Sequence, residues 1–190
     1  AEQPQLLGRT SLEEFQRYFA EGRGQLWERQ SLCKARPVCG SDAACVQAME
    51  TIRRVIVDYP WTSASAEEIR HMRIRMQQSA SDRNLKRGIG GTVDTDFIVQ
   101  MLQLKHADDH PEILVPGTLD ALAALRHAGL LAPEDAIFLD RTYRFLRSVE
   151  SGLRLMNTTA RHDLPEEELE LKKLAFLIGC ENAQQLVDDC

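Results

Sequence analysis

Several features that would assign this 190-residue sequence to a particular class of protein are missing. No apolar run approaches the roughly 18 residues that a membrane-spanning helix needs, and the first residues lack the pattern of a signal peptide. Positive charge is not in excess, because the formal net charge is −6 and the pI is near 5.4. That balance argues against bulk binding of nucleic acid or anionic membrane. We therefore expect a cytoplasmic protein with no nucleic-acid or membrane partner.

Paired and metal-binding cysteine patterns are missing, so the cysteines indicate neither a metal site nor a disulfide framework. The five cysteines form no CxxC pair, and their number is odd. Reduced thiols are expected, and three of them are predicted to lie in the core: Cys33, Cys39 and Cys45. His106 and His110 are four residues apart, but the proline that follows them favours a loop, so no metal site is expected.

Alternating strand residues, fixed-period repeats and low-complexity tracts are absent as well, whereas helical periodicity and helix end signals recur along the chain. Ser11 opens a capping box, and Pro133 begins the longest predicted helix. Pro37 ends a helix predicted over residues 25–35. The sequence predicts an all-α fold, a bundle-like array of about seven or eight helices. Residues 1–10 resemble a cut end or linker.

The most distinctive stretch is the glycine-rich turn at residues 86–91, which leads into an apolar helix predicted over residues 92–106. Its three glycines allow positive φ or a close approach of the backbone to another group. Thr92 is expected to cap the helix, with Asp94 and Asp96 in its first turn. Apolar side chains cover much of the helix surface, which predicts a central helix packed on more than one side: Phe97, Ile98, Met101, Leu102 and Leu104.

The acidic residues and the glycine turn each allow two interpretations. Asp94 and Asp96 could hold a divalent metal or a cationic group, or they could only stabilise the positive end of their own helix dipole. The second is favoured, because residues two apart face different sides of a helix. Lys86, Arg87 and the glycines could cradle a phosphate. Since neither the Walker A nor the G-x-G-x-x-G pattern is present, a packing turn is favoured.

Basic residues gather near the end of the helix predicted over residues 25–35, namely Arg29, Lys34 and Arg36. They suit the negative end of the helix dipole, and they could also face phosphates or an acidic partner. A later helix, predicted to follow Ser65, carries Arg73 on a polar, basic side. Local sequence suggests no Ser/His/Asp or Cys/His nucleophile arrangement, so no catalytic residue is assigned.

Five motifs occur in order along residues 10–165. They are Trp27-Glu-Arg-Gln-x-Leu-x-Lys-Ala-Arg36, Lys86…Gly90-Gly-Thr-Val-Asp-Thr-Asp-Phe-Ile-Val-Gln100, Thr118-Leu-Asp-Ala-Leu-Ala-Ala-Leu…Ala128-Gly-Leu-Leu131, Tyr143-Arg-Phe-Leu-Arg147 and His162-x-Leu-Pro165. Each alone is weak, but together they are specific. In these motifs the chain resembles the glutamine synthetase adenylyltransferases, and more closely their adenylylating, C-terminal half. The related uridylyltransferases of nitrogen regulatory proteins share this type of helical domain.

The resemblance implies a parent enzyme in which a nucleotidyltransferase palm precedes the helical region and supplies the metal-binding carboxylates. The palm signature is a Gly-Ser pair followed by Asp-x-Asp. It is absent, because the residues after Gly40-Ser41-Asp42 do not continue in that pattern. The chain is therefore expected to be a fragment that is inactive alone and takes no cofactor of its own. By the same resemblance, the parent uses ATP and Mg to transfer AMP to a tyrosine of glutamine synthetase, removes it by phosphorolysis, and responds to a PII-type regulatory protein.

Two hypotheses follow for the role of the chain. In the first, residues 11–165 form a helical domain of nucleotidyltransferase type, with residues 166–190 as a helical extension packed on it. This domain closes one wall of the nucleotide cleft and offers a docking face. The residues expected to line that wall are Lys86, Asp94, Asp96 and Gln100, while those expected to face phosphates or a partner are Arg29, Lys34 and Arg36. In the alternative, the chain is a pure protein-interaction module with no nucleotide contact.

Overall fold

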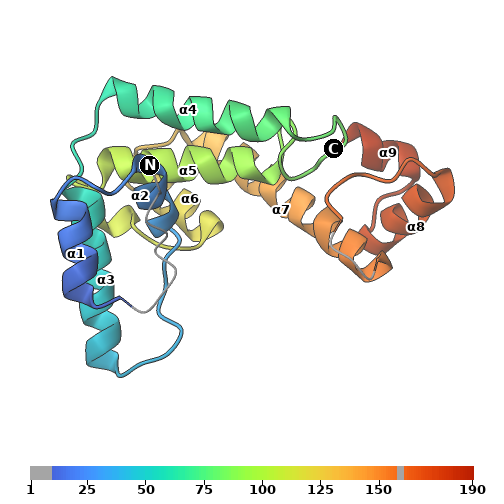
Figure 1. Cartoon of the computed structure of the whole chain (residues 1–190). Helices are drawn as coiled ribbons and strands as arrows, with labels where there is room; N and C mark the ends of the chain where they lie inside the picture. The colour runs from blue at the N-terminus through green and yellow to red at the C-terminus, as the bar shows by residue number, and fades with distance from the viewer. Residues whose placement is uncertain (1–9, 158–160) are drawn as a thin grey trace.

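The computed structural model describes residues 10–157 and 161–190. Over these ranges the chain forms nine α-helices and one 3-10 helix, and the only strand-like feature there is a bridge between Asn84 and Asp163. The all-α prediction is confirmed, with more helices than the seven or eight expected (Figure 1). None of the described helices is long and apolar enough to cross a membrane. The helices are α1 (Leu12–Ala20), α2 (Leu26–Leu32), α3 (Asp42–Val57), α4 (Ser63–Gln78), α5 (Thr92–His106), η1 (Pro111–Ile113), α6 (Thr118–His127), α7 (Pro133–Met156), α8 (Glu168–Ile178) and α9 (Ala183–Asp188).

Most helix ends follow from their immediate neighbours in the chain. The Ser11 side chain accepts the Glu14 N–H at 3.1 Å, and the Glu14 carboxylate accepts the Ser11 N–H at 3.0 Å, which is the predicted capping box. Ser41 caps α3 by accepting the N–H of Ala44. Pro133 occupies the start of α7, where its missing N–H leaves no bond unmade. These ends could therefore be predicted without knowledge of the tertiary structure.

Several helix boundaries differ from the prediction, including the start of α4, which lies at Ser63 rather than after Ser65. α2 ends at Leu32 rather than near residue 35, because residues 33–35 turn more tightly and donate to the carbonyls three positions earlier. Gly91 rather than Thr92 is the N-cap of α5, so Thr92 is the first residue inside that helix. The loop predicted before residue 114 contains the short helix η1.

The described residues form three hydrophobic clusters. The first lies among α2, α3, α4 and the end of α5, and the second lies among α5, η1, α6 and the start of α7. The third joins the C-terminal half of α7 with α8 and α9. Leu85 and Leu164, which lie outside any helix, also belong to the third cluster. Helix α5 contributes buried residues to the first and second clusters. Helix α7 contributes buried residues to the third cluster and packs against the second. These two helices therefore connect the parts of the fold.

Helix α5 is central, as predicted, and packs against α2, α4, α6 and α7 (Figure 1). Its buried side is more polar than the sequence pattern predicted, since Phe97, Ile98, Met101 and Leu102 are only half-buried. The buried residues are Thr92, Val93, Thr95, Val99, Gln100, Gln103 and Leu104. Gln103 shows how this polarity is satisfied, because its Nε2 donates to the carbonyls of Ile113 at 2.8 Å and Val115 at 3.0 Å.

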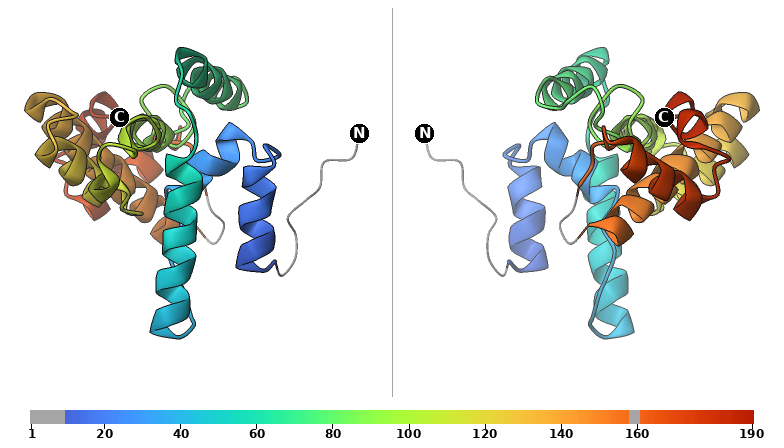
Figure 2. Two further views of the ribbon diagram at one scale, coloured as in Figure 1. Left: turned by 90° about the vertical axis from the view of Figure 1, so that its left-hand side faces the viewer. Right: turned by 90° about the vertical axis from the view of Figure 1, so that its right-hand side faces the viewer.

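The C-terminal helices pack on the second half of α7, at one end of the molecule (Figures 1 and 2). Gly152 of α7 permits this close packing. A Cβ there would lie 2.7 Å from Leu174 Cδ1 and 3.1 Å from Ile178 Cγ2, both of α8. The glycine inside a long helix, which lowers helix propensity, is thus explained by a close neighbour.

A short antiparallel pairing ties the segment before α8 to the segment before α5. The Leu85 N–H donates to the carbonyl of His162 at 2.8 Å, and the Leu164 N–H donates to the carbonyl of Arg83 at 2.9 Å. The backbone of the fifth motif is therefore bonded directly to the strand-like residues that lead into the glycine turn. Residues far apart in the sequence meet at the start of α5.

Candidate functional site

The glycine-rich turn closes tightly on its own backbone. A Cβ at Gly88 would lie 2.4 Å from the carbonyl oxygen of Asn84, and one at Gly91 would lie 2.7 Å from that of Lys86. Gly90 has φ of 74°, in the left-handed region. Each of the three glycines is therefore needed, as predicted, for close approach or for positive φ.

All amide groups of this turn except that of Ile89 donate hydrogen bonds within the described structure. The N–H of Gly88 donates to Asn84 O at 2.8 Å, that of Gly91 to Gly88 O at 3.2 Å, and that of Gly90 to the Asp94 carboxylate at 2.8 Å. The first two amides of α5 donate to the carbonyls of residues 85 and 86. A phosphate cradle needs such groups free to face the anion. The geometry supports the packing-turn interpretation.

We expect Gly91→Ala to lower the free energy of unfolding by about 2 kcal/mol, because its new Cβ would meet backbone carbonyls that cannot rotate away. Gly90→Ala is the matched control. Its Cβ would meet nothing within 4 Å, so that only the positive φ is unfavourable, by about 1 kcal/mol. Urea unfolding of both variants measures the difference, and equal losses would contradict the close-approach role of Gly91.

Asp94 is paired with an arginine from another helix. Arg73 of α4 donates from Nε to Asp94 Oδ1 at 2.6 Å and from Nη2 to Asp94 Oδ2 at 2.9 Å. The same Nη2 donates to the carbonyl of Gly88 at 2.6 Å. The Arg73 side chain is 9% exposed, so its prediction as part of a polar, basic surface is wrong. A bidentate carboxylate compensates its charge, and the pair fastens α4, the turn and α5 together.

Asp96 points to different partners, as its spacing from Asp94 predicted. Its Oδ1 accepts the Thr118 hydroxyl at 2.7 Å and lies 2.7 Å from Lys34 Nζ. The prediction that both aspartates occupy the first turn of α5 is wrong for Asp96, because only Asp94 lies there. The two carboxylates do not form a chelating pair. Over residues 10–157 and 161–190, no group of three or more His, Cys, Asp or Glu residues is arranged to hold a metal ion.

Gln100 is buried within the helical body. Its Oε1 accepts a hydrogen bond from Gln30 Nε2 at 2.9 Å, which joins α5 to α2. Both side chains are less than 9% exposed, so neither presents its amide to an outside ligand. A buried amide pair of this kind fixes how two helices meet.

The three cations predicted to face a phosphate or partner do not lie on one surface. Arg29 is buried and donates from Nη1 to the carbonyl of Val55. Lys34 pairs with Asp96, whereas Arg36 is exposed. They were predicted to act together because they are close in sequence. In the structure, α2 directs Arg29 into the core and ends at Leu32, before Lys34 and Arg36.

Lys86 is the one predicted wall residue whose side-chain charge is not paired within the described part of the chain, where no carboxylate lies within 4 Å of its ammonium. Its backbone is fixed, because its carbonyl accepts the Val93 N–H at 3.1 Å. The residue is half-buried. A held backbone with an unengaged cation is an arrangement that can meet an anionic group.

The cysteines are not alike. Cys33 is buried, as predicted, and burial raises the pKa of its thiol to about 12. Such a thiol is inert at neutral pH. Cys45 is half-buried, and Cys39 is exposed, so the core prediction is wrong for Cys39. It follows Pro37, beyond the end of α2, where no helix covers it.

Glu150 is a buried charged residue that sequence reasoning missed. It is 2% exposed and lies in α7, where its carboxylate pairs with Arg147 and approaches His162 Nδ1 to 3.6 Å. His162 belongs to the fifth motif, so this contact links the motif to α7. From the sequence alone, a glutamate between regularly spaced apolar residues is expected on the solvent side of its helix. The burial of Glu150 could not be predicted, because His162 approaches it from a separate segment.

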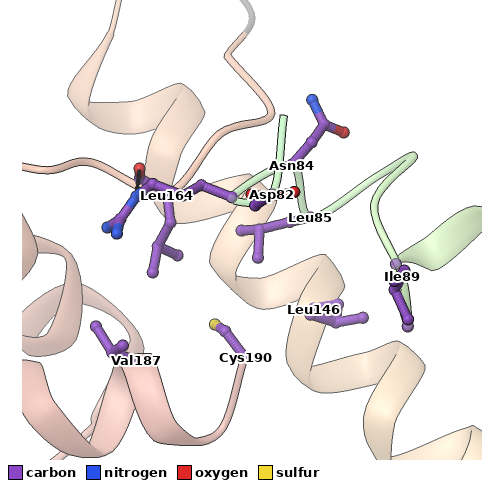
Figure 3. Close-up of a pocket in the computed structure, with 11 residues that line it drawn as sticks. Asp82, Asn84, Leu85, Ile89, Leu146, Leu164, Val187 and Cys190 are labelled. Atoms are coloured by element: carbon purple, nitrogen blue, oxygen red, sulfur yellow. Dashed lines mark hydrogen bonds between the residues drawn. The ribbon is translucent and has the colours of Figure 1, made fainter. Parts of the chain in front are cut away.

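A small cavity lies between the glycine turn, α7 and the C-terminal residues (Figure 3). Its volume is about 160 Å³, and Leu85, Leu146, Leu164 and Val187 line it. Its arginine is already engaged, because Arg83 donates to the carbonyls of residues 164 and 165. The cavity therefore offers no converging set of free polar groups for chemistry.

Comparison with known proteins first defines the class of domain. A family model described as GlnD PII-uridylyltransferase matches residues 63–188. Three bifunctional glutamine synthetase adenylyltransferase/adenylyl-removing enzymes are similar over most of this chain. The enzyme from Streptomyces coelicolor is 36% identical over 80% of the chain, that from Mycobacterium tuberculosis 38% over 76%, and that from Agrobacterium fabrum 32% over 87%.

The chain thus belongs to the glutamine synthetase adenylyltransferase family, as its motifs predicted. It spans 16%, 15% and 18% of the length of these three curated relatives. Within the described residues, the motifs that carry the resemblance build a helical support: a closed turn, two separately paired aspartates and a buried amide pair around α5.

Proposed function

We propose that this chain is the helical, non-catalytic part of a cytoplasmic glutamine synthetase adenylyltransferase. The whole enzyme would transfer AMP from ATP to glutamine synthetase, with Mg, and remove it again in nitrogen regulation. Its partners would be its own nucleotidyltransferase palm, glutamine synthetase and a PII-type regulatory protein. The observation that carries the proposal is the 36% identity to the Streptomyces coelicolor enzyme over 80% of this chain. In this role the chain closes one wall of the nucleotide cleft and docks the partner.

Within this role, the carboxylates position the wall rather than bind metal. Asp94 is held by Arg73 and by the Gly90 amide, and Asp96 is held by Lys34 and Thr118. Mg²⁺ needs carboxylate oxygens that are free to enter an octahedral shell. These residues do not fit a magnesium site, so no metal step is assigned to this chain.

The cation that meets the nucleotide is Lys86. The closed turn holds its backbone against α5, and its ammonium is unpaired within the described residues. A lysine in this setting acts as a point charge toward phosphate oxygens. Asp94 and Gln100 contribute indirectly, because they fix the turn and helix from which Lys86 projects.

We expect Lys86→Ala, in the chain joined to its palm, to lower kcat/KM for ATP by roughly 10- to 100-fold, since a hydrogen bond to a charged group contributes about 1.5–3 kcal/mol. The measurement is AMP incorporation into glutamine synthetase as ATP is varied. Lys105→Ala is the matched control, because Lys105 is exposed at the other end of α5. Its kinetics should match those of the unmodified enzyme.

The alternative is a pure interaction module. The observation that speaks for it is that Asp94, Asp96 and Gln100 are already held by partners within the described residues, namely Arg73, Lys34 and Gln30. In that case Lys86→Ala leaves the kinetic constants for ATP unchanged and alters only those for the protein substrate. Isothermal titration of ATP-Mg would then give the same Kd for the palm alone and for the palm joined to this chain. Those two results together would replace the cleft-wall function with the interaction function.

A further inference from the structure

The first turns of α3 project from the helical body and are not packed into it (Figures 1 and 2). None of the three hydrophobic clusters that the described residues form includes a member of residues 34–51. Within this span only Thr51 is buried, at the point where the Gln16 amide of α1 donates to its hydroxyl at 3.4 Å. The start of α3 therefore depends on its Ser41 cap and on its own backbone hydrogen bonds. A helix end with so few buried contacts opens readily.

Two cysteines meet at this projecting end. Cys39 is exposed in the loop before α3, and Cys45 is half-buried in the helix itself. The Cys45 Sγ lies 3.9 Å from the carbonyl oxygen of Cys39, and a Cβ at Gly40 would lie 3.5 Å from the same sulfur. The sulfur of Cys45 is thus already placed against the backbone that carries Cys39. Gly40 has φ of 134°, and a glycine can change its conformation at little cost, so this backbone can bring the two side chains together.

The other three cysteines are less suited to thiol chemistry. Burial raises the pKa of the Cys33 thiol to about 12 and that of Cys190 to about 11, and it also raises the pKa of Cys180. Since the thiolate is the form that attacks a disulfide, these thiols react slowly at neutral pH. Cys39 and Cys45 are the pair that both geometry and exposure select.

We propose that Cys39 and Cys45 are a redox-active pair, which closes a disulfide when a low-molecular-weight disulfide such as oxidised glutathione is supplied. The bond would staple the loop before α3 to the first turn and a half of that helix, where no hydrophobic cluster of the described residues does so. The pair shares no residue with the glycine turn or with Lys86. It can therefore hold or fail independently of the cleft-wall function.

The reaction is a double thiol–disulfide exchange. The exposed Cys39 thiolate attacks one sulfur of oxidised glutathione, whose S–S bond breaks, and the first glutathione leaves as a thiolate. The Cys45 thiolate then attacks the Cys39 sulfur of this mixed disulfide, forms the Cys39–Cys45 bond and releases the second glutathione. The two released thiolates take up the two protons that the protein thiols lose. The cysteines are oxidised, and oxidised glutathione is reduced to two molecules of glutathione.

To test the proposal, the folded chain is incubated with oxidised glutathione, its remaining thiols are alkylated, and it is then digested by a protease that cleaves before aspartate. Cleavage before Asp42 separates Cys39 from Cys45, so mass spectrometry detects the two peptides joined only if the disulfide has formed. We expect the joined peptides to predominate and Cys33 to stay a thiol. Hydrogen exchange in the first two turns of α3 should slow at least about 10-fold on oxidation and recover with dithiothreitol.

Two variants provide the controls. Cys45→Ser lies outside every hydrophobic cluster of the described residues, and its reaction should stop at a mixed disulfide between Cys39 and glutathione. Cys180→Ser replaces another half-buried cysteine and should form the Cys39–Cys45 bond as the unmodified chain does. The pair does not exist if Cys39 of the unmodified chain keeps its glutathione, or if the bond forms no faster in the folded chain than in urea. Unchanged hydrogen exchange in α3 after the bond has formed would contradict the stapling role.

Discussion

Replacing Asp94 with alanine is expected to lower the free energy of unfolding by about 3 kcal/mol, because it leaves a buried guanidinium without its carboxylate. Arg73 is 9% exposed at its side chain, and after the substitution only the carbonyl of Gly88 remains near its Nη2. The turn loses a second bond as well, since the Gly90 N–H donates to the same carboxylate. Urea unfolding followed by far-UV circular dichroism measures the loss.

A double variant separates the ion pair from the aspartate itself. Arg73→Met together with Asp94→Ala removes the buried charge along with its partner, so it should be more stable than Asp94→Ala alone. Asp108→Ala, at an exposed loop position, is the control and should change stability by less than about 0.5 kcal/mol. If Asp94→Ala lowers the free energy of unfolding no more than Asp108→Ala does, the Asp94 carboxylate does not stabilise the fold. The interpretation of Asp94 as a ligand-binding residue would then be favoured.

This pairing also bears on why the site resembles a catalytic one in sequence. Residues 86–96 contain three glycines, two cations and two aspartates, a composition that indicates a phosphate-binding or metal-binding site. In the folded chain the glycine amides bind their own carbonyls and the aspartates bind Arg73 and Lys34. The same residue types therefore serve to hold a helix entrance rigid. Of the set, Lys86 and the exposed Arg87 keep charges that form no ion pair within the described residues.

The features that could be predicted from sequence are local ones. The capping box at Ser11, the proline at Pro133 and the left-handed conformation of Gly90 depend on residues within a few positions of each other. The central place of α5 followed from its many apolar residues. The 3-10 helix η1 was predicted as a loop, because its three residues are too few to carry a periodic signal.

The features that could not be predicted depend on partners distant in the chain. Arg73 looks like a surface residue until Asp94, twenty-one positions later, is known to lie against it. Gln100 needs Gln30, seventy positions earlier, and Glu150 needs the segment at His162. Periodicity assigns a polar residue to the surface by default. It fails where a second polar residue across an interface makes burial favourable.

The second large effect concerns the attachment of α8 and α9. Leu153→Ala is expected to lower the free energy of unfolding by about 3 kcal/mol, because the side chain is fully buried in the cluster that joins α7 to α8 and α9, and its truncation leaves a cavity there. Leu155→Ala is the matched control on the same helix. Leu155 is 79% exposed, so its loss should change stability by less than about 0.5 kcal/mol.

The same variant tests whether the C-terminal helices and the glycine turn belong to one cooperative unit. Leu153 shares its cluster with Leu85, whose N–H donates to the carbonyl of His162. If the cluster holds these segments together, Leu153→Ala should speed hydrogen exchange at the Leu85 and Leu164 amides as well as within α8. Faster exchange confined to α8 and α9 would mean that residues 166–190 are a separate appendage. The start of α5 would then be stabilised without them, and the proposed wall would not depend on this extension.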